Sequence, residues 1–318
     1  RQIEEDLQRL SRISGCGRTY SIEHGLDQVA GIAGKYGLKV MQGLWLSSHA
    51  EKNARQIDTV VALANRHRDV IRSVVVGNEV LLRGEMSGVD LAATIRRVKA
   101  AVPVPVTYAD VWEFWLRHRE VYEAVDFVTI HILPYWEDFP IAAEHAAAHV
   151  DSIRSRVAAA FPEKEILIGE VGWPSAGRMR EGALPSPANQ ARVLHEVLAA
   201  AQRGQYRVNL IEAFDQPWKR WLEGTAGGYW GLYDDRNREP KFTWGAPVSD
   251  HPLWRIEAVA GALLAAAVFA AGWWGARGRP APGGTGLWFA VAAIAIVSGS
   301  LIGWTAEKTI LESLGVGG

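Results

Sequence analysis

The run VVVGNEV, residues 74–80, carries the pattern that decides the fold. Three valines and a glycine are followed by Asn78 and Glu79, where a buried strand should end. The run ILIGEVGWP, residues 166–174, has the same form, with Glu170 after three aliphatic residues and a glycine. A carboxylate at the end of a buried strand is costly unless it is paired or used in chemistry. Both glutamates are therefore candidate functional residues.

Seven apolar runs of this kind recur between residues 15 and 217, and stretches of helical periodicity lie between them. The runs are GCGRTYS (15–21), LKVMQGLWL (38–46), IRSVVVGNEVL (71–81), VPVTYADVW (104–112), DFVTIHILPYW (126–136), EILIGEVGWP (165–174) and RVNLIEAFDQP (207–217). Their spacing suits buried parallel strands joined by helical crossovers. The pattern predicts an α/β fold, most simply a TIM (β/α)8 barrel. The alternative, an open doubly wound sheet, favours a glycine-rich phosphate loop that the sequence lacks.

The first 13 residues, RQIEEDLQRLSRI, form an amphipathic helical pattern with no strand before it. Because a barrel of this class has eight strands, we expect strand 1 to be missing from this chain. We also expect the chain to be a piece of a longer protein.

Composition narrows the classes of function. The length of 318 residues allows one domain of about 250 residues with an appendage. A net charge of -1 without a long basic run argues against a nucleic-acid partner. The single cysteine, Cys16, excludes an intrachain disulfide and a multi-cysteine zinc site. No metal-ligand spacing is present, and we expect no metal ion.

The composition changes after Lys241, which predicts two domains. We expect a barrel over residues 1–247, followed over 248–318 by a linker and two transmembrane helices at about 253–274 and 285–306. Each apolar stretch is long enough to cross a bilayer, and tryptophans lie near its ends. The alternative is a helical hairpin buried in a core. Arg277 and Arg279 in the connector predict, by the positive-inside rule, an inner-membrane protein whose barrel lies on the periplasmic side.

The active site of a parallel barrel lies at the carboxyl ends of its strands. Glu79 and Glu170 should therefore face each other across the barrel mouth. A separation of about 5 to 5.5 Å would suit a retaining double displacement at a sugar. The alternative is a pair of glutamates held in salt bridges.

Four motifs in order, VGNEV, HILPYW, IGEVGWPSAG and EAFDQPWK, resemble glycoside hydrolase family 17 over roughly residues 2–244. The resemblance implies a barrel enzyme that acts on β-1,3-glucan without a cofactor. It implies that Glu79 is the acid/base, that Glu170 is the nucleophile, and that Asn78 holds the sugar 2-hydroxyl. The acid/base must hold a proton when the leaving oxygen departs, and the nearby negative charge should help it to do so.

Further residues are candidate substrate contacts. Tyr135 is a natural hydrogen-bond donor to Glu170, with a rim aromatic as the alternative. His131 is either a core histidine or a substrate contact. Indole rings stack on sugar C–H faces, although each tryptophan has packing as its alternative role. Gln216 stands where plant family members carry a glutamate. The full set is Asn78, Tyr135, Trp136, Trp173, Glu212, Asp215, Trp218, Lys219, Tyr20, Trp45 and His131.

The same glycosyl-enzyme intermediate can be released by a sugar hydroxyl or by water. The motif set and the apolar helices are similar to those of bacterial membrane-linked family members, some of which are fused to a glucan synthase. We therefore expect a β-1,3-glucanosyltransferase that remodels an exported β-glucan, with a glucan synthase as a further partner. An endo-β-1,3-glucanase is the alternative, and a non-catalytic glucan-binding module is the third hypothesis.

Overall fold

The computed structural model describes residues 1–251, 253–277 and 284–314. The described residues form two compact units. The first comprises residues 1–173 and 192–213, and the second lies within residues 174–191 and 214–318. The predicted division at residues 247 and 248 stays a prediction, because these units are defined by compactness alone.

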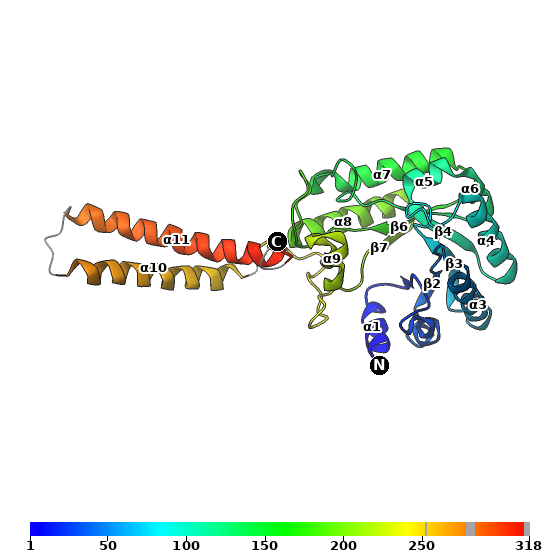
Figure 1. Ribbon diagram of the computed structural model, residues 1–318, viewed down its shortest axis with the longest axis horizontal. Coiled ribbons are helices and arrows are strands. Elements are labelled where there is room, and N and C mark those ends of the chain that lie inside the picture. The colour runs from blue at the N-terminus through cyan, green and yellow to red at the C-terminus, as the bar shows by residue number, and fades with distance from the viewer. Residues whose placement is uncertain (252, 278–283, 315–318) are drawn as a thin grey trace. The chain divides into compact units, whose positions relative to one another are not determined.

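The first unit is a nearly closed barrel of seven parallel strands, which neighbour one another in chain order (Figure 1). The strands are β1 (Cys16–Arg18), β2 (Lys39–Leu44), β3 (Ile71–Asn78), β4 (Val106–Val111), β5 (Val128–His131), β6 (Ile166–Val171) and β7 (Val208–Leu210). Each strand lies within one of the seven apolar runs, so the predicted parallel α/β barrel is confirmed. β1 and β7 are the edges of the sheet, and within the described ranges no strand pairs between them.

Helices connect the strands and cover the outside of the sheet. They are α1 (Gln2–Leu10), α2 (Val29–Ala33), α3 (Ala50–Arg66), α4 (Gly88–Ala101), α5 (Trp112–Arg117), α6 (Arg119–Ala124), α7 (Ala143–Ala160) and α8 (Pro187–Gly204), with short 3-10 helices η1 (Leu26–Gln28) and η2 (Gly34–Tyr36). Leu7 of α1 packs in one cluster with Val29, Ala33, Leu38 and Val40, which attaches the N-terminal helix to α2 and β2.

The core explains why the strands appear as continuous apolar runs. β5 and β6 are buried at every position, and β3 is buried at every position except Arg72. Side chains of these strands pack on both faces of the sheet, so both faces must be apolar. The edge strands β1 and β7 are instead only partly buried.

The second unit is joined internally by a buried cation. The Lys241 amine lies 2.6 Å from Asp215 Oδ1, 2.7 Å from Ser175 Oγ and 3.0 Å from the Tyr229 carbonyl. These contacts tie residues from two separate parts of the chain. The same unit holds η3 (Pro217–Lys219), α9 (Arg220–Glu223), η4 (Thr225–Gly228), α10 (Trp254–Ala276) and α11 (Gly284–Glu312).

α10 and α11 are long and apolar enough to cross a membrane, since an 18-residue stretch within Trp254–Ala276 has a mean hydropathy of 1.8 and one within Gly286–Glu312 has 2.0. The two predicted helices are therefore present. α11 continues past the expected end at Ala306 as far as Glu312. Of the two connector arginines, Arg279 lies outside the described residues.

Small residues allow α10 and α11 to pack closely. Gly261 and Ala265 are the buried residues of α10, and they are four positions apart. Ala295 and Gly299 on α11 have the same spacing, and a Cβ atom at Gly299 would lie 2.5 Å from the Gly261 carbonyl oxygen. The backbones therefore approach through a small-residue contact of the kind that favours helix pairing in membranes.

We predict that Gly299→Leu forces α10 and α11 apart, because its side chain would occupy space held by the Gly261 backbone. Gly303→Leu on the same helix is the control, since a Cβ atom there meets nothing within 4 Å. Spin labels at the exposed Val268 and Val297, in a Cys16→Ser background, report the separation. The label distance should grow by roughly 2 Å or more in Gly299→Leu only. Equal distances in the two variants would contradict the contact.

Candidate active site

Glu79 directly follows β3, and Glu170 lies near the carboxyl end of β6. β3 ends at Asn78, and the backbone takes positive φ values on either side of this residue, 90° at Gly77 and 52° at Glu79. A glycine suits the first position, because positive φ disfavours residues that carry a Cβ atom. Glu170 lies within β6, directly beside His131 at the end of β5 in the parallel register. The strand ends thus bring the two carboxylates to one place.

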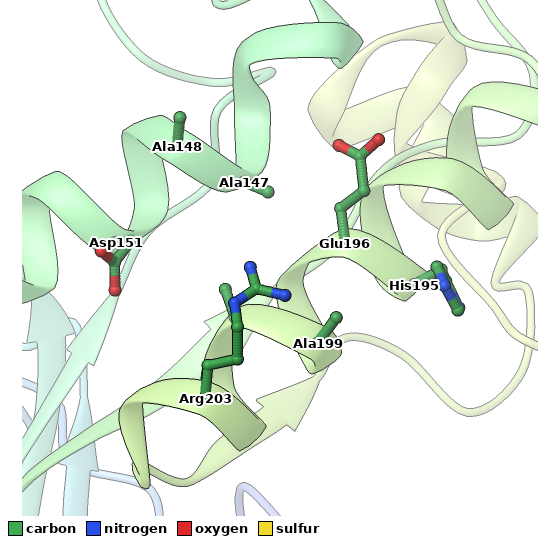
Figure 2. A pocket seen from close by; sticks show the side chains of 8 residues that line it. Ala147, Ala148, Asp151, His195, Glu196, Ala199 and Arg203 are labelled. Carbon is green, nitrogen blue, oxygen red and sulfur yellow. The ribbon is translucent and has the colours of Figure 1, made fainter.

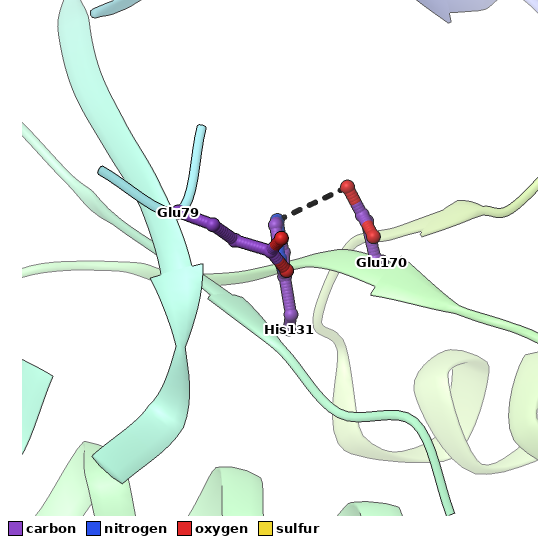
Figure 3. A group of neighbouring side chains, drawn as sticks. All are labelled: Glu79, His131 and Glu170. Atoms are coloured by element: carbon purple, nitrogen blue, oxygen red, sulfur yellow. Dashed lines mark hydrogen bonds and ion pairs between the residues drawn. The ribbon is translucent and has the colours of Figure 1, made fainter. Parts of the chain in front are cut away.

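One imidazole lies between the two carboxylates (Figure 3). His131 Nδ1 lies 2.9 Å from Glu79 Oε1, and His131 Nε2 lies 3.4 Å from Glu170 Oε1. A carboxylate oxygen of Glu79 and one of Glu170 lie within 4.8 Å of each other. This spacing is close to the roughly 5 to 5.5 Å of retaining glycosidases and shorter than the roughly 6.5 to 9.5 Å of inverting ones.

The two carboxylates differ in their exposure to solvent. The Glu79 side chain is 25% exposed, whereas that of Glu170 is 6% exposed. An acid/base that exchanges protons with a leaving group or an acceptor must be accessible from outside the protein. A buried carboxylate that stays ionised needs hydrogen-bond donors around it. The difference suits the acid/base and nucleophile roles that the family resemblance implies, and these roles stay predictions.

Arg18, at the end of β1, supplies a buried positive charge. Its Nη1 atom lies 2.9 Å from the Gly169 carbonyl oxygen, 3.3 Å from His131 Nε2 and 3.5 Å from Glu170 Oε1. Its Nη2 atom donates to Asn78 Oδ1 at 2.5 Å. Because the Asn78 oxygen accepts from Arg18, the amide nitrogen is the end that faces away from the guanidinium. That orientation suits donation to a sugar hydroxyl.

Tyr20 also hydrogen-bonds Glu170. Burial, followed by the negative charge of Glu170, raises the pKa of Tyr20 well above its usual value. Tyr20 is therefore a neutral hydroxyl donor, and it stabilises a negative charge on Glu170 together with Arg18. Glu212, after β7, lies near enough to add to the same shift. Tyr20 thus has the donor contact that the sequence led us to expect from Tyr135, whose own bond to Glu170 stays a prediction.

Asp110 and Tyr108, both on β4, support the loop that follows Glu79. The Tyr108 hydroxyl donates a hydrogen bond to Asp110 and accepts one from the Leu81 amide at 3.0 Å. Asp110 in turn accepts a hydrogen bond from the Leu82 amide at 3.4 Å. Burial raises the pKa of Asp110 to about 6, and the charge of Glu79 adds to this shift. Sequence reasoning missed both residues. The signal was present, because Asp110 is a strand-end acid in VPVTYADVW, as Glu79 is in VVVGNEV.

The aromatic candidates of the first unit differ in exposure. Trp45 is 37% exposed, and the Arg83 guanidinium lies 4.2 Å from its ring centre. Trp136 packs edge-on to the buried Tyr135, with 4.8 Å between the two ring centres. Trp173 is fully buried and contacts Tyr135 edge-on at 6.1 Å. For Trp173, packing fits this burial better than an exposed sugar platform, whereas Trp45 keeps an accessible ring.

Three further candidates lie in the second unit. Asp215 is buried and accepts from the Lys241 amine and from the Gly231 amide at 2.8 Å. Burial raises the pKa of Asp215 to about 6, although Lys241 opposes the shift. These contacts indicate a structural role for Asp215. Trp218 is 59% exposed, with its indole nitrogen 3.1 Å from Gln216 Oε1, and Lys219 ends η3 beside it.

Glu79, His131 and Glu170 also have the donor atoms and the proximity to hold a metal ion. Arg18 already places a cation against His131 and Glu170, so a divalent ion would add positive charge to a buried group. The arrangement therefore favours a protein cation in this position over a metal.

A surface cavity of about 470 Å³ lies between helices α7 and α8 (Figure 2). Its lining consists of alanines and charged side chains of these helices, namely Ala147, Ala148, Asp151, His195, Glu196, Ala199, Ala200 and Arg203. None of them is a strand-end residue or a predicted site residue. The groove therefore has none of the convergent chemistry found around His131.

Comparison with known proteins agrees with the family predicted from the motifs. The family model described as BtgE/BtgC glycoside hydrolase domain matches residues 1–231. Glucan 1,3-beta-glucosidase from Arthroderma benhamiae is 25% identical over 257 residues, covering 76% of this chain and 83% of that protein. Glucan 1,3-beta-glucosidase from Candida albicans is 25% identical over 253 residues, covering 73% and 82%.

A solved structure gives a similar result. The glycoside hydrolase family 17 β-1,3-glucanosyltransferase from Rhizomucor miehei superposes with a TM-score of 0.69 at 26% identity, covering 77% of this chain and 91% of that one. An active-site mutant of that enzyme has been solved in complex with laminaritriose. The relatives named here are fungal, so the predicted bacterial membrane-linked branch stays a prediction.

We predict that Gly169→Ala destabilises the barrel, since its Cβ atom would lie 2.3 Å from Thr129 Cγ2 and 3.2 Å from Arg18 Nη1. Overpacking of this kind costs about 1–3 kcal/mol or more. Gly17→Ala is the control, because a Cβ atom at Gly17 meets nothing within 4 Å. Thermal unfolding should show a lower midpoint for Gly169→Ala only. Matching midpoints would refute the tight packing assigned to Gly169.

Proposed function

Because the chain belongs to the BtgE/BtgC glycoside hydrolase domain family, we propose that it is a retaining enzyme that acts on β-1,3-glucan through a covalent glycosyl-enzyme intermediate. The observation that carries the proposal is the Glu79–Glu170 pair, with carboxylate oxygens within 4.8 Å of each other at the strand ends. The names of the relatives support β-1,3-glucan as the substrate class.

The reaction has two steps. In the first, Glu170 attacks the anomeric carbon while Glu79 donates a proton to the departing glycosidic oxygen. Arg18 and Tyr20 hold the Glu170 carboxylate by hydrogen bonds, which keeps its charge available for attack. In the second step, Glu79 takes a proton from the incoming hydroxyl, which attacks the same carbon and releases Glu170.

We favour a sugar hydroxyl over water as the acceptor in the second step, which makes the enzyme a glucanosyltransferase. The support comes from the Rhizomucor miehei glucanosyltransferase, of which this chain covers 91%. The residues that form the intermediate do not choose the acceptor. That choice depends on how acceptor sugars bind and exclude water. Hydrolysis is the competing outcome of the same intermediate.

Several of the predicted contact residues would bind the glucan. Asn78 would donate to the sugar 2-hydroxyl, and Trp45 offers an accessible ring on which a sugar can stack. Trp136, Trp218 and Lys219 remain proposed contacts. Glu212 is a further proposed contact, and its charge adds to the raised pKa of Tyr20, the residue that hydrogen-bonds the nucleophile. No cofactor is required by this chemistry.

We assign the α10–α11 hairpin to a membrane, because both helices combine sufficient length with exposed apolar side chains. Arg277 follows α10, and the positive-inside rule then puts this end of the hairpin in the cytoplasm and the barrel on the periplasmic side of an inner membrane. An enzyme held there would remodel an exported glucan, with a membrane-bound glucan synthase as a natural partner.

We predict that incubation with a laminari-oligosaccharide gives products longer than the substrate, as measured by mass spectrometry. Glu170→Ala should remove this activity and Glu79→Ala should lower it, whereas Glu196→Ala on α8 should retain it because Glu196 lies outside the site. Glu79→Ala should lose about 10²–10⁴-fold, the usual contribution of a general acid. Only shorter products would indicate hydrolysis, and unchanged substrate with the intact chain would refute the enzyme assignment.

Azide separates the two roles when the substrate carries a dinitrophenyl leaving group. In Glu79→Ala, azide should attack the glycosyl-enzyme and give a β-glycosyl azide. In Glu170→Ala, azide should attack the substrate directly and give an α-glycosyl azide. The reverse pattern would exchange the two assignments.

The membrane orientation predicts different labelling of two introduced cysteines. In a Cys16→Ser background, Val89→Cys on the barrel should react with an impermeant maleimide in spheroplasts. Arg277→Cys should react only after the membrane is permeabilised. Both side chains are exposed in the structure, so access is set by the membrane. Labelling of Arg277→Cys in intact spheroplasts would invert the orientation.

A further inference from the structure

The two oxygens of the Glu79 carboxyl group are not equivalent. Oε1 lies 2.9 Å from His131 Nδ1, so the position of the Glu79 proton depends on which nitrogen of His131 carries hydrogen. If Nδ1 carries it, Oε1 must accept. If Nδ1 is bare, a protonated Oε1 would donate to His131 and its proton would face away from the substrate. The tautomer of His131 therefore decides which oxygen of Glu79 can deliver a proton.

Arg18 determines this tautomer. A guanidinium group only donates hydrogen bonds, and Arg18 Nη1 lies 3.3 Å from His131 Nε2. Nε2 therefore accepts, and it carries no hydrogen. The ring is neutral, because burial lowers the pKa of His131 to about 4. A neutral imidazole has one N–H group, which is then left to Nδ1.

Glu170 is the group that opposes this arrangement. Its Oε1 atom lies 3.4 Å from His131 Nε2 and would accept a hydrogen from that nitrogen. Such a hydrogen would point toward the Arg18 cation, which is closer to Nε2 and itself donates to Glu170. Tyr20 donates to Glu170 as well. Glu170 thus receives hydrogen bonds from Arg18 and Tyr20 without His131, and Nε2 accepts a hydrogen bond from Arg18.

We propose that Arg18 and His131 are positioning residues that place the transferable proton of Glu79 on its Oε2 atom, an inference that rests on the proposed acid/base role of Glu79. Arg18 donates to Nε2, Nδ1 donates to Oε1, and the proton of the acid is left on Oε2. When the C–O bond breaks, the leaving oxygen takes the bonding electron pair and this proton. Glu170 forms the new bond to the anomeric carbon.

The same hydrogen bond serves the second step. After proton donation Glu79 is a carboxylate, and the Nδ1–H group stabilises its charge at Oε1. Oε2 is then free of that bond and takes the proton of the incoming hydroxyl. Asp110 on β4 also faces Glu79, because the charge of Glu79 adds to the raised pKa of Asp110. In both steps, Oε1 of Glu79 therefore accepts the hydrogen bond from His131, and Oε2 gives or takes the proton.

Nitrogen-15 NMR of the full chain in detergent, with ring-labelled histidine, tests the tautomer directly. The spectrum of the His131→Asn variant identifies the His131 signals by their absence. At pH 6 we expect a protonated Nδ1 and an unprotonated Nε2. A protonated Nε2 would overturn the proposal, whatever the activity of the enzyme. This result needs no substrate, so it stands apart from any failure of the proposed function.

Kinetics of two variants test the consequence. An asparagine amide can replace Nδ1 as the donor, whereas a glutamine amide reaches the position of Nε2. On laminari-oligosaccharide, His131→Gln should lose about 10²-fold or more in kcat/KM, and His131→Asn should stay within about tenfold of the wild type. On a dinitrophenyl glycoside, whose leaving group departs without a proton, the kcat/KM of both variants should stay within about tenfold of the wild type. An equal loss of His131→Gln on both substrates would show that His131 supports the fold or the nucleophile instead.

Discussion

The buried guanidinium of Arg18 is the interaction on which the rest of the site depends. Taking a cation out of water is costly, and the cost is offset only when every neighbouring group has the right polarity. Around Arg18 these groups are the Gly169 carbonyl, His131 Nε2, Glu170 and Asn78 Oδ1. Arg18 lies on β1 and these groups come from β3, β5 and β6, so the curvature of the parallel sheet brings them together.

This contact links the fold to the chemistry. Arg18 balances the charge of the proposed nucleophile, orients the amide that would bind the sugar, and selects the imidazole tautomer beside the proposed acid. Asp110 and Tyr108 hold the loop after Glu79 from the other side. The choice between transfer and hydrolysis depends instead on the aromatic side chains and loops that would bind the sugar, because both outcomes use the same intermediate.

Much of this arrangement followed from the sequence, because strand-end acids and apolar runs are local patterns. The runs gave the seven strands, and the two glutamates were found as strand-end residues. Arg18 is absent from the predicted set of site residues, since a position at the end of a short, partly exposed strand does not reveal which way a side chain points. Trp173 is buried because its surroundings are set by tertiary packing with Tyr135. α11 runs past the apolar stretch because charged residues can continue a helix.

The central claim is that Glu170 forms a covalent bond to the sugar during a retaining reaction. Incubation with a 2-deoxy-2-fluoro laminaribiosyl fluoride tests it most directly, because the fluorine slows release of the intermediate. Proteolysis and mass spectrometry should then find the fluorinated disaccharide on the peptide that contains Glu170. Modification of the Glu79 peptide instead, or an unmodified protein after the reagent has been turned over, would contradict the account.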